Sequence, residues 1–466
     1  MMRSHDDRTL VVLMDGIPLG EVYEDRSRGV RLRYDPAYSS TPGAVPLSLS
    51  MPLSARRHNT SVLSPWMDNL LPDRPEVLTR WRREFRVPNQ SAFALLRHVG
   101  EDVAGAAQFV RSDRVDEASV PGPVEPMTDA DVAERLRRLR QDPAAWEPTT
   151  GTGQFSLAGS QSKFALHFDG TTWGLPTGRT PTTHIIKPAI SGMLDQDLNE
   201  HLSLRAARTV GLTVPESGVV TFDGERAFVV RRYDRVRTVE GWERVHQEDM
   251  CQALGVSPRM KYEQNGGPSA PDIATLIREN VPSAHAEADV RRFADAIIYN
   301  WIIVGTDAHA KNYSMLLARS GQARFAPLYD LNSYLPYQAA QAKPTLSMKV
   351  GTSKRRPDLI GVQDWQAFAR HIGVPEQHIF TRIKEMSTQL PDAFSTAADH
   401  ADVTELASDL PGRLTDAVAA KAERCAKIIA PQSKTSIAGG RGRVKRGVPN
   451  GGQFTGRQHP ESDVRL

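Results

Sequence analysis

The chain has 466 residues, of which 39% are hydrophobic and 24% are charged. This length is too great for one ordinary core and predicts two or three domains, and the composition is typical of a soluble globular protein, which excludes a wholly disordered chain. The net charge of +3 is too small to indicate nucleic-acid binding by the whole chain.

Residues 1–112 are expected to form a small N-terminal α+β domain. A hairpin is predicted around Asp15-Gly16 and an alternating strand over residues 30–34, and helical patterns follow. Residues 113–130 are rich in proline, glycine and acidic residues, which predicts a linker. A helix should begin at its end, with Thr128 and Asp131 as the cap.

Residues 131–235 are expected to form a nucleotide-binding lobe. A Gly-rich segment over residues 151–161 leads into a strand over 163–168, which turns at Asp169-Gly170 and is followed by a strand over 183–187. Backbone N–H groups of a Gly-rich loop can cradle phosphates. Lys187, at the end of the second strand, would present a positive charge to the α- and β-phosphates, and Glu200 on the next helix is a candidate ion-pair partner for it.

Residues 236–430 are expected to form a helical catalytic lobe. Its informative stretch places Asp307 five positions before Asn312, with Asp330 further on. In protein kinases an Asp accepts the substrate hydroxyl proton, and an Asn five residues later and a second Asp hold magnesium ions. Apolar residues at intervals of three or four over 290–304 predict a helix before this loop, and a hairpin over 313–328 would return Asp330 to the same side.

Each of these features also has a plain structural interpretation. An Asp and an Asn in a polar loop often only cap turns, a Gly-rich turn is usually only a turn, and a lysine at a strand end is usually solvated. Their order along one chain is that of a kinase, and this order favours a phosphotransferase.

Residues 431–466 form a tail rich in Gly, Pro, Ser and Arg, which predicts disorder. Its basic residues could contact the phosphates of operator DNA or an acidic partner, but a solubilising tail without a specific partner is the favoured interpretation. The longest apolar stretch, residues 294–305, is shorter than the ~20 residues that span a bilayer. The two cysteines, Cys251 and Cys425, have no metal-binding spacing, so we expect inert thiols and a cytoplasmic protein without membrane contact.

Several longer motifs make a family recognisable. Five of them lie in the two predicted lobes: Gln154-Phe-Ser156-Leu-Ala-Gly159-Ser-Gln161-Ser-Lys163, Pro181-Thr-Thr-His-Ile-Ile-Lys187, Gln247-Glu-Asp-Met-Cys-Gln252, Gly305-Thr-Asp307-Ala-His309-Ala-Lys311-Asn312 and Tyr329-Asp330. Three lie in the N-terminal region: Pro46-Leu-Ser-Leu-Ser-Met-Pro52, Asp68-Asn-Leu-Leu-Pro-Asp73 and Gly100-Glu-Asp-Val-Ala-Gly105. Together they resemble the HipA family of bacterial toxin kinases, over about residues 8 to 430.

This resemblance implies a serine/threonine protein kinase that uses ATP and Mg²⁺. The implied fold is α+β and two-lobed, like protein kinases and distantly like phosphoinositide kinases, with an extra small N-terminal α+β domain and a helical C-terminal lobe. The usual partner is a small DNA-binding antitoxin, HipB-like, through which DNA would be contacted indirectly. Family members arrest growth by phosphorylating a translation component, commonly an aminoacyl-tRNA synthetase.

The resemblance also implies roles for single residues. Asp307 would be the catalytic base, Asn312 and Asp330 the magnesium ligands, Lys187 the phosphate-binding lysine, and Ser156 an autophosphorylated loop serine. Further nucleotide contacts would come from Gly153, Ser156, Leu157, Ala158, Gly159, Arg232, Tyr233 and Lys311.

This sequence departs from related kinases at two positions, and these departures limit which family properties can be assigned to it. Arg231 stands before Arg232-Tyr233-Asp234-Arg235 where some relatives have Glu, which leaves the purine preference open. Leu331-Asn332 follows Asp330 in place of the Phe-Gly of eukaryotic kinases, so a phenylalanine switch is not expected.

Two other function classes remain. A small-molecule phosphotransferase shares the Asp, Asn and Asp arrangement but would label no protein in a lysate. A nucleotide-binding pseudokinase acting as a co-repressor is the second alternative, and the presence of Lys187, Asp307, Asn312 and Asp330 argues against it.

Overall fold

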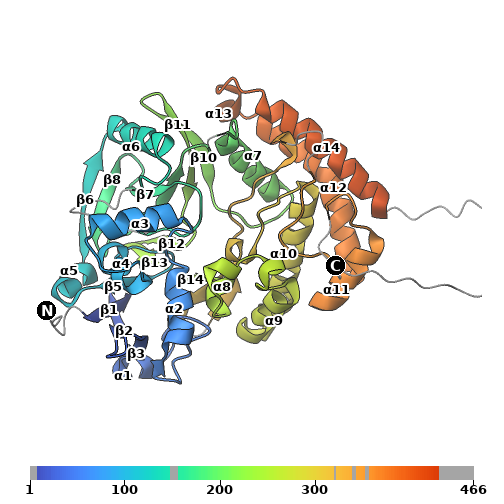
Figure 1. Cartoon of the computed structure of the whole chain (residues 1–466). Helices are drawn as coiled ribbons and strands as arrows, with labels where there is room; N and C mark the ends of the chain where they lie inside the picture. The colour runs from blue at the N-terminus through green and yellow to red at the C-terminus, as the bar shows by residue number, and fades with distance from the viewer. Residues whose placement is uncertain are drawn as a thin grey trace, which may run out of the picture. The chain divides into compact units, whose positions relative to one another are not determined.

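The computed structural model describes residues 8–146, 156–190, 192–319, 322–337, 343–351 and 356–429, which form mixed α and β structure (Figure 1). The predicted phosphate contact of Gly153 and the predicted disordered tail over 431–466 lie outside these residues. In the described part of the chain, no helix is both long and apolar enough to cross a membrane.

The N-terminal residues fold around a five-stranded antiparallel sheet. Its order is β4 (Arg57–His58), β3 (Val30–Tyr34), β2 (Ile17–Glu24), β1 (Thr9–Met14) and β5 (Ala107–Val110). In β3 the side chains of Val30, Leu32 and Tyr34 are buried while Arg31 and Arg33 are exposed, as the predicted alternation requires. Four helices lie between β3 and β5 in the chain: α1 (Pro36–Ser40), α2 (Thr60–Asp68), α3 (Pro75–Glu84) and α4 (Ala92–Val99).

The segment 113–130 differs from the linker that its composition predicts. It forms a 3-10 turn, η2 (Ser112–Arg114), a short helix, α5 (Val115–Ser119), and a strand, β6 (Pro121–Met127). β6 pairs with β8 (Trp173–Gly178) at the edge of a second sheet. An edge strand tolerates proline because its outer side needs no hydrogen-bond donors, so the three prolines of β6 concealed a strand.

The second sheet has six antiparallel strands. Their order is β10 (Ser217–Phe222), β11 (Glu225–Arg231), β9 (His184–Lys187), β7 (Phe164–Phe168), β8 and β6. The helix α6 (Asp129–Gln141) begins at the predicted capping box of Thr128 and Asp131. The helix α7 (Gln196–Thr209) packs on β10 and β11 and buries most of its side chains. This packing brings α7 beside the last residue of β9, which is Lys187.

The C-terminal part is mostly helical. Its small sheet has the order β14 (His246–Asp249), β15 (Ser314–Ala318) and β16 (Gln322–Phe325), and a two-stranded ribbon, β12 (Arg235–Thr238) and β13 (Gly241–Arg244), precedes it in the chain. The helices are α8 (Met250–Ala253), α9 (Ala270–Asn280), α10 (Ser283–Ile302), α11 (Val362–Ile372), α12 (Glu376–Ala398), α13 (Ala401–Thr404) and α14 (Leu410–Ile429). Its described residues also form the 3-10 turns η3 (Pro258–Met260), η4 (Glu263–Asn265), η5 (Ala310–Asn312) and η7 (Leu335–Tyr337). In Figure 1 these helices lie on the side of the described residues opposite the β6–β8 strands.

Two local predictions for this part are confirmed. Val290, Phe293, Ile297 and Trp301 form a buried stripe along α10. β15 and β16 form the predicted antiparallel hairpin. The buried stripe fixes α10 in the core, and the loop that follows it therefore begins from a rigid support.

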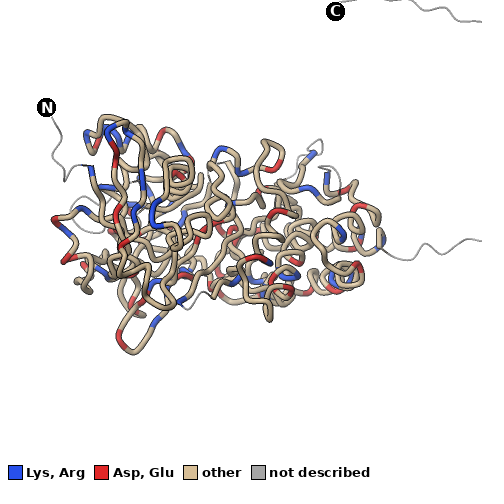
Figure 2. Tube along the Cα trace, turned by 90° about the horizontal axis from the view of Figure 1, so that it is seen from below, with Lys and Arg blue, Asp and Glu red and all other residues tan. Residues whose placement is uncertain are grey.

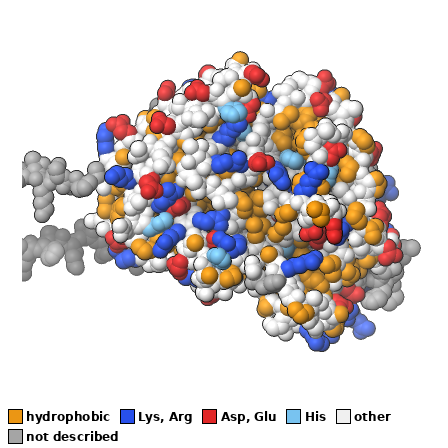
Figure 3. Space-filling model, turned by 180° about the vertical axis from the view of Figure 1, so that it is seen from behind, with side chains coloured by type: hydrophobic (Ala, Val, Ile, Leu, Met, Phe, Trp, Pro, Cys, Tyr) orange, Lys and Arg blue, Asp and Glu red, His pale blue; other side chains and the backbone are white. Residues whose placement is uncertain are grey.

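Charges of both signs are interspersed over the described residues. Figure 2 shows Lys and Arg mixed with Asp and Glu along the trace, and charged side chains are scattered among apolar and uncharged ones on the face in Figure 3. The mixed pattern agrees with the small net charge of +3. The surface charge pattern of the described residues therefore does not mark a functional site, whereas charged groups buried in the interior can do so.

Candidate functional site

One pocket collects most of the residues that the sequence predicts to act together. It lies where the Gly-rich segment, the end of β9, the strand β14 and the loops around β15 and β16 meet. Nine predicted residues line it: Leu157, Ala158, Gly159, Lys187, Arg232, Tyr233, Lys311, Asn312 and Asp330. Residues from three distant parts of the sequence thus enclose one space.

A buried lysine links two carboxylates in this pocket. Lys187 Nζ lies 2.7 Å from Glu200 Oε1 and 3.1 Å from Asp330 Oδ1, so the ion pair with Glu200 forms as predicted. Burial alone would lower the pKa of Lys187, but the charges of Asp330 and Glu200 raise it, and the lysine stays protonated. Burial likewise opposes ionisation of Asp330, yet Lys187 and Lys163 hold its pKa at about 2. Asp330 is therefore an anion at neutral pH.

The loop after α10 carries Asp307 and Asn312. Its sharp start needs Gly305, because a Cβ there would lie 2.1 Å from Asn300 Oδ1. Asn312 Nδ2 donates to the backbone oxygen of Asp307 over 2.8 Å, which closes the loop into a fixed shape. The Asp307 carboxylate keeps 61% of its accessible surface and accepts a hydrogen bond of 2.8 Å from the hydroxyl of Tyr262. The surrounding protein removes part of the water around Asp307 and raises its pKa, and nearby Asp330 adds to the effect.

The oxygen ligands in the pocket fit a hard divalent cation. Asn312 uses its amide nitrogen for Asp307, which leaves its side-chain oxygen available, and Asp330 supplies a carboxylate. Among the described residues, no cluster of three or more His, Cys, Asp or Glu could hold a metal by itself. A magnesium ion held by one or two protein oxygens and by nucleotide phosphates matches this sparse set.

The Gly-rich segment reaches the pocket from residue 157 onward. The Lys163 ammonium group donates to the carbonyl of Ala158 over 2.6 Å, and burial together with Lys187 lowers the pKa of Lys163 to about 8. Ser156 does not line the pocket: it is buried, and its hydroxyl donates to the carbonyl of Leu70 over 2.8 Å. The structure therefore places Ser156 against the N-terminal region, away from the expected phosphate position.

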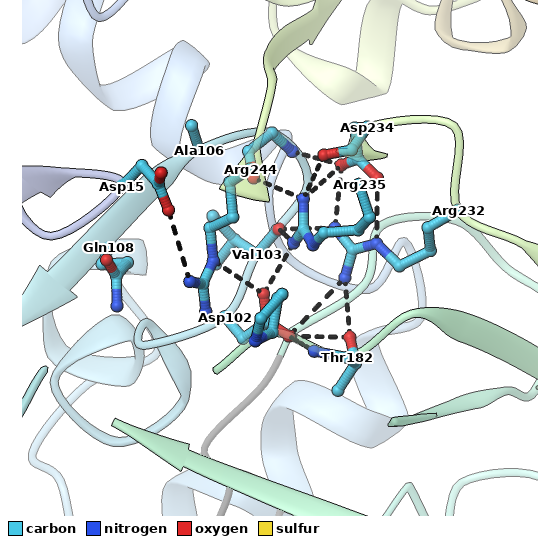
Figure 4. Close-up of polar contacts among 12 residues, drawn as sticks. Asp15, Asp102, Val103, Ala106, Gln108, Thr182, Arg232, Asp234, Arg235 and Arg244 are labelled. Atoms are coloured by element: carbon cyan, nitrogen blue, oxygen red, sulfur yellow. Dashed lines mark hydrogen bonds and ion pairs between the residues drawn. The ribbon is translucent and has the colours of Figure 1, made fainter. Parts of the chain in front are cut away.

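Two residues predicted to contact nucleotide use their side chains elsewhere. The Arg232 guanidinium lies in a buried network with Asp234, Thr182 and the carbonyl of Val103 (Figure 4). Three further members of the network are Asp102, Arg235 and Arg244. Asp102 comes from the N-terminal motif and is held ionised, since the three arginines outweigh its burial and lower its pKa. The Arg232 guanidinium is thus engaged within the protein, which leaves the backbone of Arg232 to meet a ligand.

Tyr233 packs at the back of the pocket. Its ring stacks on Tyr329 with centroids 5.7 Å apart, and its hydroxyl donates to Gln247. The hydroxyl of Tyr329 in turn donates to the carbonyl of Lys311 over 2.7 Å. The aromatic pair therefore joins the segment after β11 to the loop that carries Asn312.

Several site residues lay outside the sequence predictions, among them Asp73, Lys261 and Tyr262. Asp73 pairs with Lys311 over 2.7 Å and with Lys261 over 2.9 Å, and Tyr262 binds Asp307. Asp73 ends one of the N-terminal motifs, and that motif was the only signal that pointed to it. His309, which belongs to the same loop, packs edge-on against Tyr262, and burial lowers its pKa to about 3, so it is neutral.

Sequence comparison identifies the family. A model of the HipA-like C-terminal domain matches residues 155–394, and one of the HipA N-terminal domain matches residues 10–110. The protein Y4mE of Sinorhizobium fredii, whose name records a provisional kinase assignment, is 35% identical over 86% of this chain and 93% of its own length. The serine/threonine-protein kinase toxin HipA of Shewanella oneidensis is 30% identical over 75% of this chain and 80% of its own length.

A solved structure has the same fold. It is that of a HipA from Shewanella oneidensis in complex with HipB and its operator DNA, with a TM-score of 0.75 at 24% identity, and the match covers 90% of this chain and 98% of that one. The resemblance predicted from the motifs is confirmed, and the chain belongs to the HipA family.

Proposed function

We propose that this protein is an ATP- and Mg²⁺-dependent serine/threonine protein kinase and the toxin of a type II toxin–antitoxin module. The observation that carries the proposal is the contact between Lys187 and Asp330, 3.1 Å apart, in the same pocket as Asn312 and next to the loop of Asp307. Phosphoryl transfer requires a phosphate-binding cation, metal ligands and a base, and Lys187, the pair Asn312 and Asp330, and Asp307 would supply them in that order.

Each residue has a distinct task in this proposal. Lys187, kept protonated by Asp330 and Glu200, offers its ammonium group to the α- and β-phosphates. Asn312 and Asp330 offer oxygen ligands to a magnesium ion, which when bound would neutralise charge on the β- and γ-phosphates. Asp307 does not itself line the pocket but lies in the loop of Asn312, which does; it accepts the proton of the substrate hydroxyl, and its accessible carboxylate suits a bulky protein substrate.

The adenine side is expected to be read by backbone and by apolar surface. Leu157, Ile185 and Val230 line the pocket there, while the side chains of Arg232 and Tyr233 are engaged elsewhere. Arg231, which departs from some relatives, lies over the Trp242 ring and 3.3 Å from Glu216. Arg231 also lines the pocket, so its side chain contacts Trp242 and Glu216 at the edge of the proposed nucleotide site.

The fold implied by this function is the two-lobed kinase fold, distantly like phosphoinositide kinases. Its parts would be the N-terminal domain over residues 1–112, the nucleotide-binding lobe over 131–235, to whose sheet β6 adds an edge strand, and the helical lobe over 236–430. Similarity to a HipA that forms a complex with HipB and operator DNA supports a small DNA-binding antitoxin as the partner. DNA would be reached through that antitoxin, and the site of action would be the cytoplasm. The substrate would be a translation component such as an aminoacyl-tRNA synthetase, with autophosphorylation of Ser156 as a side reaction.

The test uses the purified chain, radiolabelled Mg-ATP and a bacterial lysate. We expect label on serine or threonine of a lysate protein, and a loss of at least about 10²-fold in rate for Asp307→Asn, since the base is removed while the fold is kept. Asp416→Asn, at an exposed carboxylate of α14, is the matched control and should keep full activity.

Other outcomes would assign the protein to another class. ATP consumption without any labelled protein would indicate a small-molecule phosphotransferase. ATP binding without turnover would indicate a pseudokinase that acts as a co-repressor. An Asp307→Asn variant with wild-type turnover would remove Asp307 from its role.

A further inference from the structure

Asp73 of the N-terminal region reaches into the candidate site. It lies in the turn between α2 and α3, and its side chain is 10% exposed. Its carboxylate forms two ion pairs, Oδ1 with Lys311 Nζ at 2.7 Å and Oδ2 with Lys261 Nζ at 2.9 Å. The two lysines outweigh its burial and lower its pKa, so Asp73 is ionised.

The same residue also holds the Gly-rich segment. The backbone N–H of Asp73 donates to the carbonyl of Gly159 over 2.9 Å, beside a bridge between Pro72 and Gly159. Gly159, Lys311 and Asp73 all line the pocket. One residue from outside both predicted lobes therefore contacts the two segments that would lie on either side of the transferred phosphate.

Both lysines are tied to the loop that carries Asp307 and Asn312, Lys311 as a member of it and Lys261 through its backbone carbonyl. Lys311 immediately precedes Asn312, and its carbonyl accepts the Tyr329 hydroxyl. Lys261 accepts a backbone hydrogen bond of 3.2 Å from Ala310 and precedes Tyr262, which binds Asp307. A shift of either ammonium group would thus be transmitted to the groups proposed as base and metal ligand.

We propose that Asp73 is a positioning residue for phosphoryl transfer: its carboxylate fixes Lys311 and Lys261 and so keeps the catalytic loop in register with the Gly-rich segment. This inference rests on the proposed kinase function. It gives the N-terminal region a direct part in the reaction, in addition to its role in the fold.

The changes in ATP binding and in reaction rate caused by Asp73→Asn distinguish a positioning role from a role in folding alone. Asp73→Asn keeps the backbone bond to Gly159 but removes the charge that balances two buried ammonium groups. The variant should then bind the polyanionic nucleotide as tightly as wild type or more tightly, because the positive charge of the two lysines near the phosphates is less neutralised. The reaction itself should slow, because a small misplacement of catalytic groups lowers the rate steeply.

The experiment measures kcat and KM for ATP, with the melting temperature, for wild type, Asp73→Asn and Asp73→Glu. We expect kcat to fall at least about tenfold in Asp73→Asn without a rise in KM, and to recover in part in Asp73→Glu, which keeps the charge. Asp116→Asn, at an exposed carboxylate of α5, is the control and should match wild type. In a Lys311→Met background, Asp73→Asn should lower kcat much less, because the two act through one contact.

Several results would overturn the proposal. These are an unchanged kcat in Asp73→Asn, a fall in kcat with a raised KM and a lower melting temperature, loss of cooperative unfolding, or full additivity with Lys311→Met. Wild-type protein that labels a substrate alongside a fully active Asp73→Asn would reject only this inference. Wild-type protein that transfers no phosphate would reject the proposed function and this inference with it.

Discussion

The hydroxyl of Tyr262 donates a hydrogen bond to the carboxylate of Asp307, with Oη and Oδ1 2.8 Å apart. This bond favours the ionised form of Asp307 and partly offsets the loss of surrounding water that raises its pKa. Because Asp307 acts as a base only when ionised, activity should fall as the pH drops through its pKa. The contact therefore sets the acid limit of the proposed reaction.

Tyr262→Phe should move that limit. Loss of the hydrogen bond should raise the pKa of Asp307, so the acid limb of the kcat profile should shift to higher pH by up to about one unit. Tyr38→Phe, which also removes a hydroxyl that bonds a backbone carbonyl, is the control and should leave the profile in place. A Tyr262→Phe profile that coincides with wild type would show that the tyrosine does not tune the base.

Asp330 is expected to control the response to magnesium. In Asp330→Ala the pocket loses its ionised carboxylate beside Lys187, and ATP binding should no longer tighten when magnesium is added, since hard cations need oxygen ligands. Calorimetric titration of ATP with and without magnesium measures this. Asp307→Asn should keep the magnesium response, and an Asp330→Ala variant that keeps it too would place the metal elsewhere.

Glu248 should make stability depend on pH. It is fully buried on β14, and its carboxylate accepts hydrogen bonds from the N-terminal Ser48 hydroxyl (2.6 Å) and Leu49 N–H (2.8 Å) and from Trp66 Nε1 (3.1 Å). Burial raises its pKa from 4.5 to about 7. The folded state therefore favours the protonated form, and this contribution is complete below about pH 4.5 and lost as the pH rises through about 7.

Glu248→Gln should remove this dependence. Relative to wild type, the free energy of unfolding of the variant should rise between pH 5 and pH 8, by on the order of 3 kcal/mol at most. Urea unfolding at several pH values measures the difference, and the neighbouring Asp249, with its pKa raised to about 6, is common to both proteins. Glu405→Gln, at an exposed site, should show no such trend. A difference that stays constant with pH would contradict the raised pKa.

Local patterns predicted the parts of the site that one segment determines. The buried stripe of α10, the hairpin of β15 and β16, and the pairing of Lys187 with Glu200 thirteen residues later all follow from periodicity and spacing. These features are formed by residues close together in the sequence, so the spacing of apolar and charged residues predicts them.

Tertiary contacts determined the rest, and hydrophobic periodicity and short-range spacing do not reveal such contacts. Tyr262 lies 45 positions from Asp307, and Asp73 lies 238 positions from Lys311. The prolines of β6 predict a loop, but the segment forms a strand because it pairs with β8 at the edge of the sheet. Ser156 falls in the predicted Gly-rich segment, yet its hydroxyl faces Leu70, because the N-terminal region covers it.

Ser156 is the subject of the last prediction. Its hydroxyl is buried against the carbonyl of Leu70, and its backbone N–H donates to the carbonyl of Asp102 over 3.1 Å. A phosphate there would add nearly two negative charges where there is no room for them, so the segment would have to leave this position. Because Leu157, Ala158 and Gly159 follow directly and line the pocket, the nucleotide site should be lost with it.

We therefore expect slow self-inactivation through Ser156. Ser156→Asp should bind ATP much more weakly than wild type, whereas Ser156→Ala, which loses one hydrogen bond worth about 1 kcal/mol, should keep most of the affinity. Mass spectrometry of protein purified from cells should find phosphate on Ser156 in wild type and none in Asp307→Asn. The prediction is wrong if Ser156 stays unmodified in active protein after prolonged incubation with Mg-ATP, or if Ser156→Asp binds ATP as tightly as wild type.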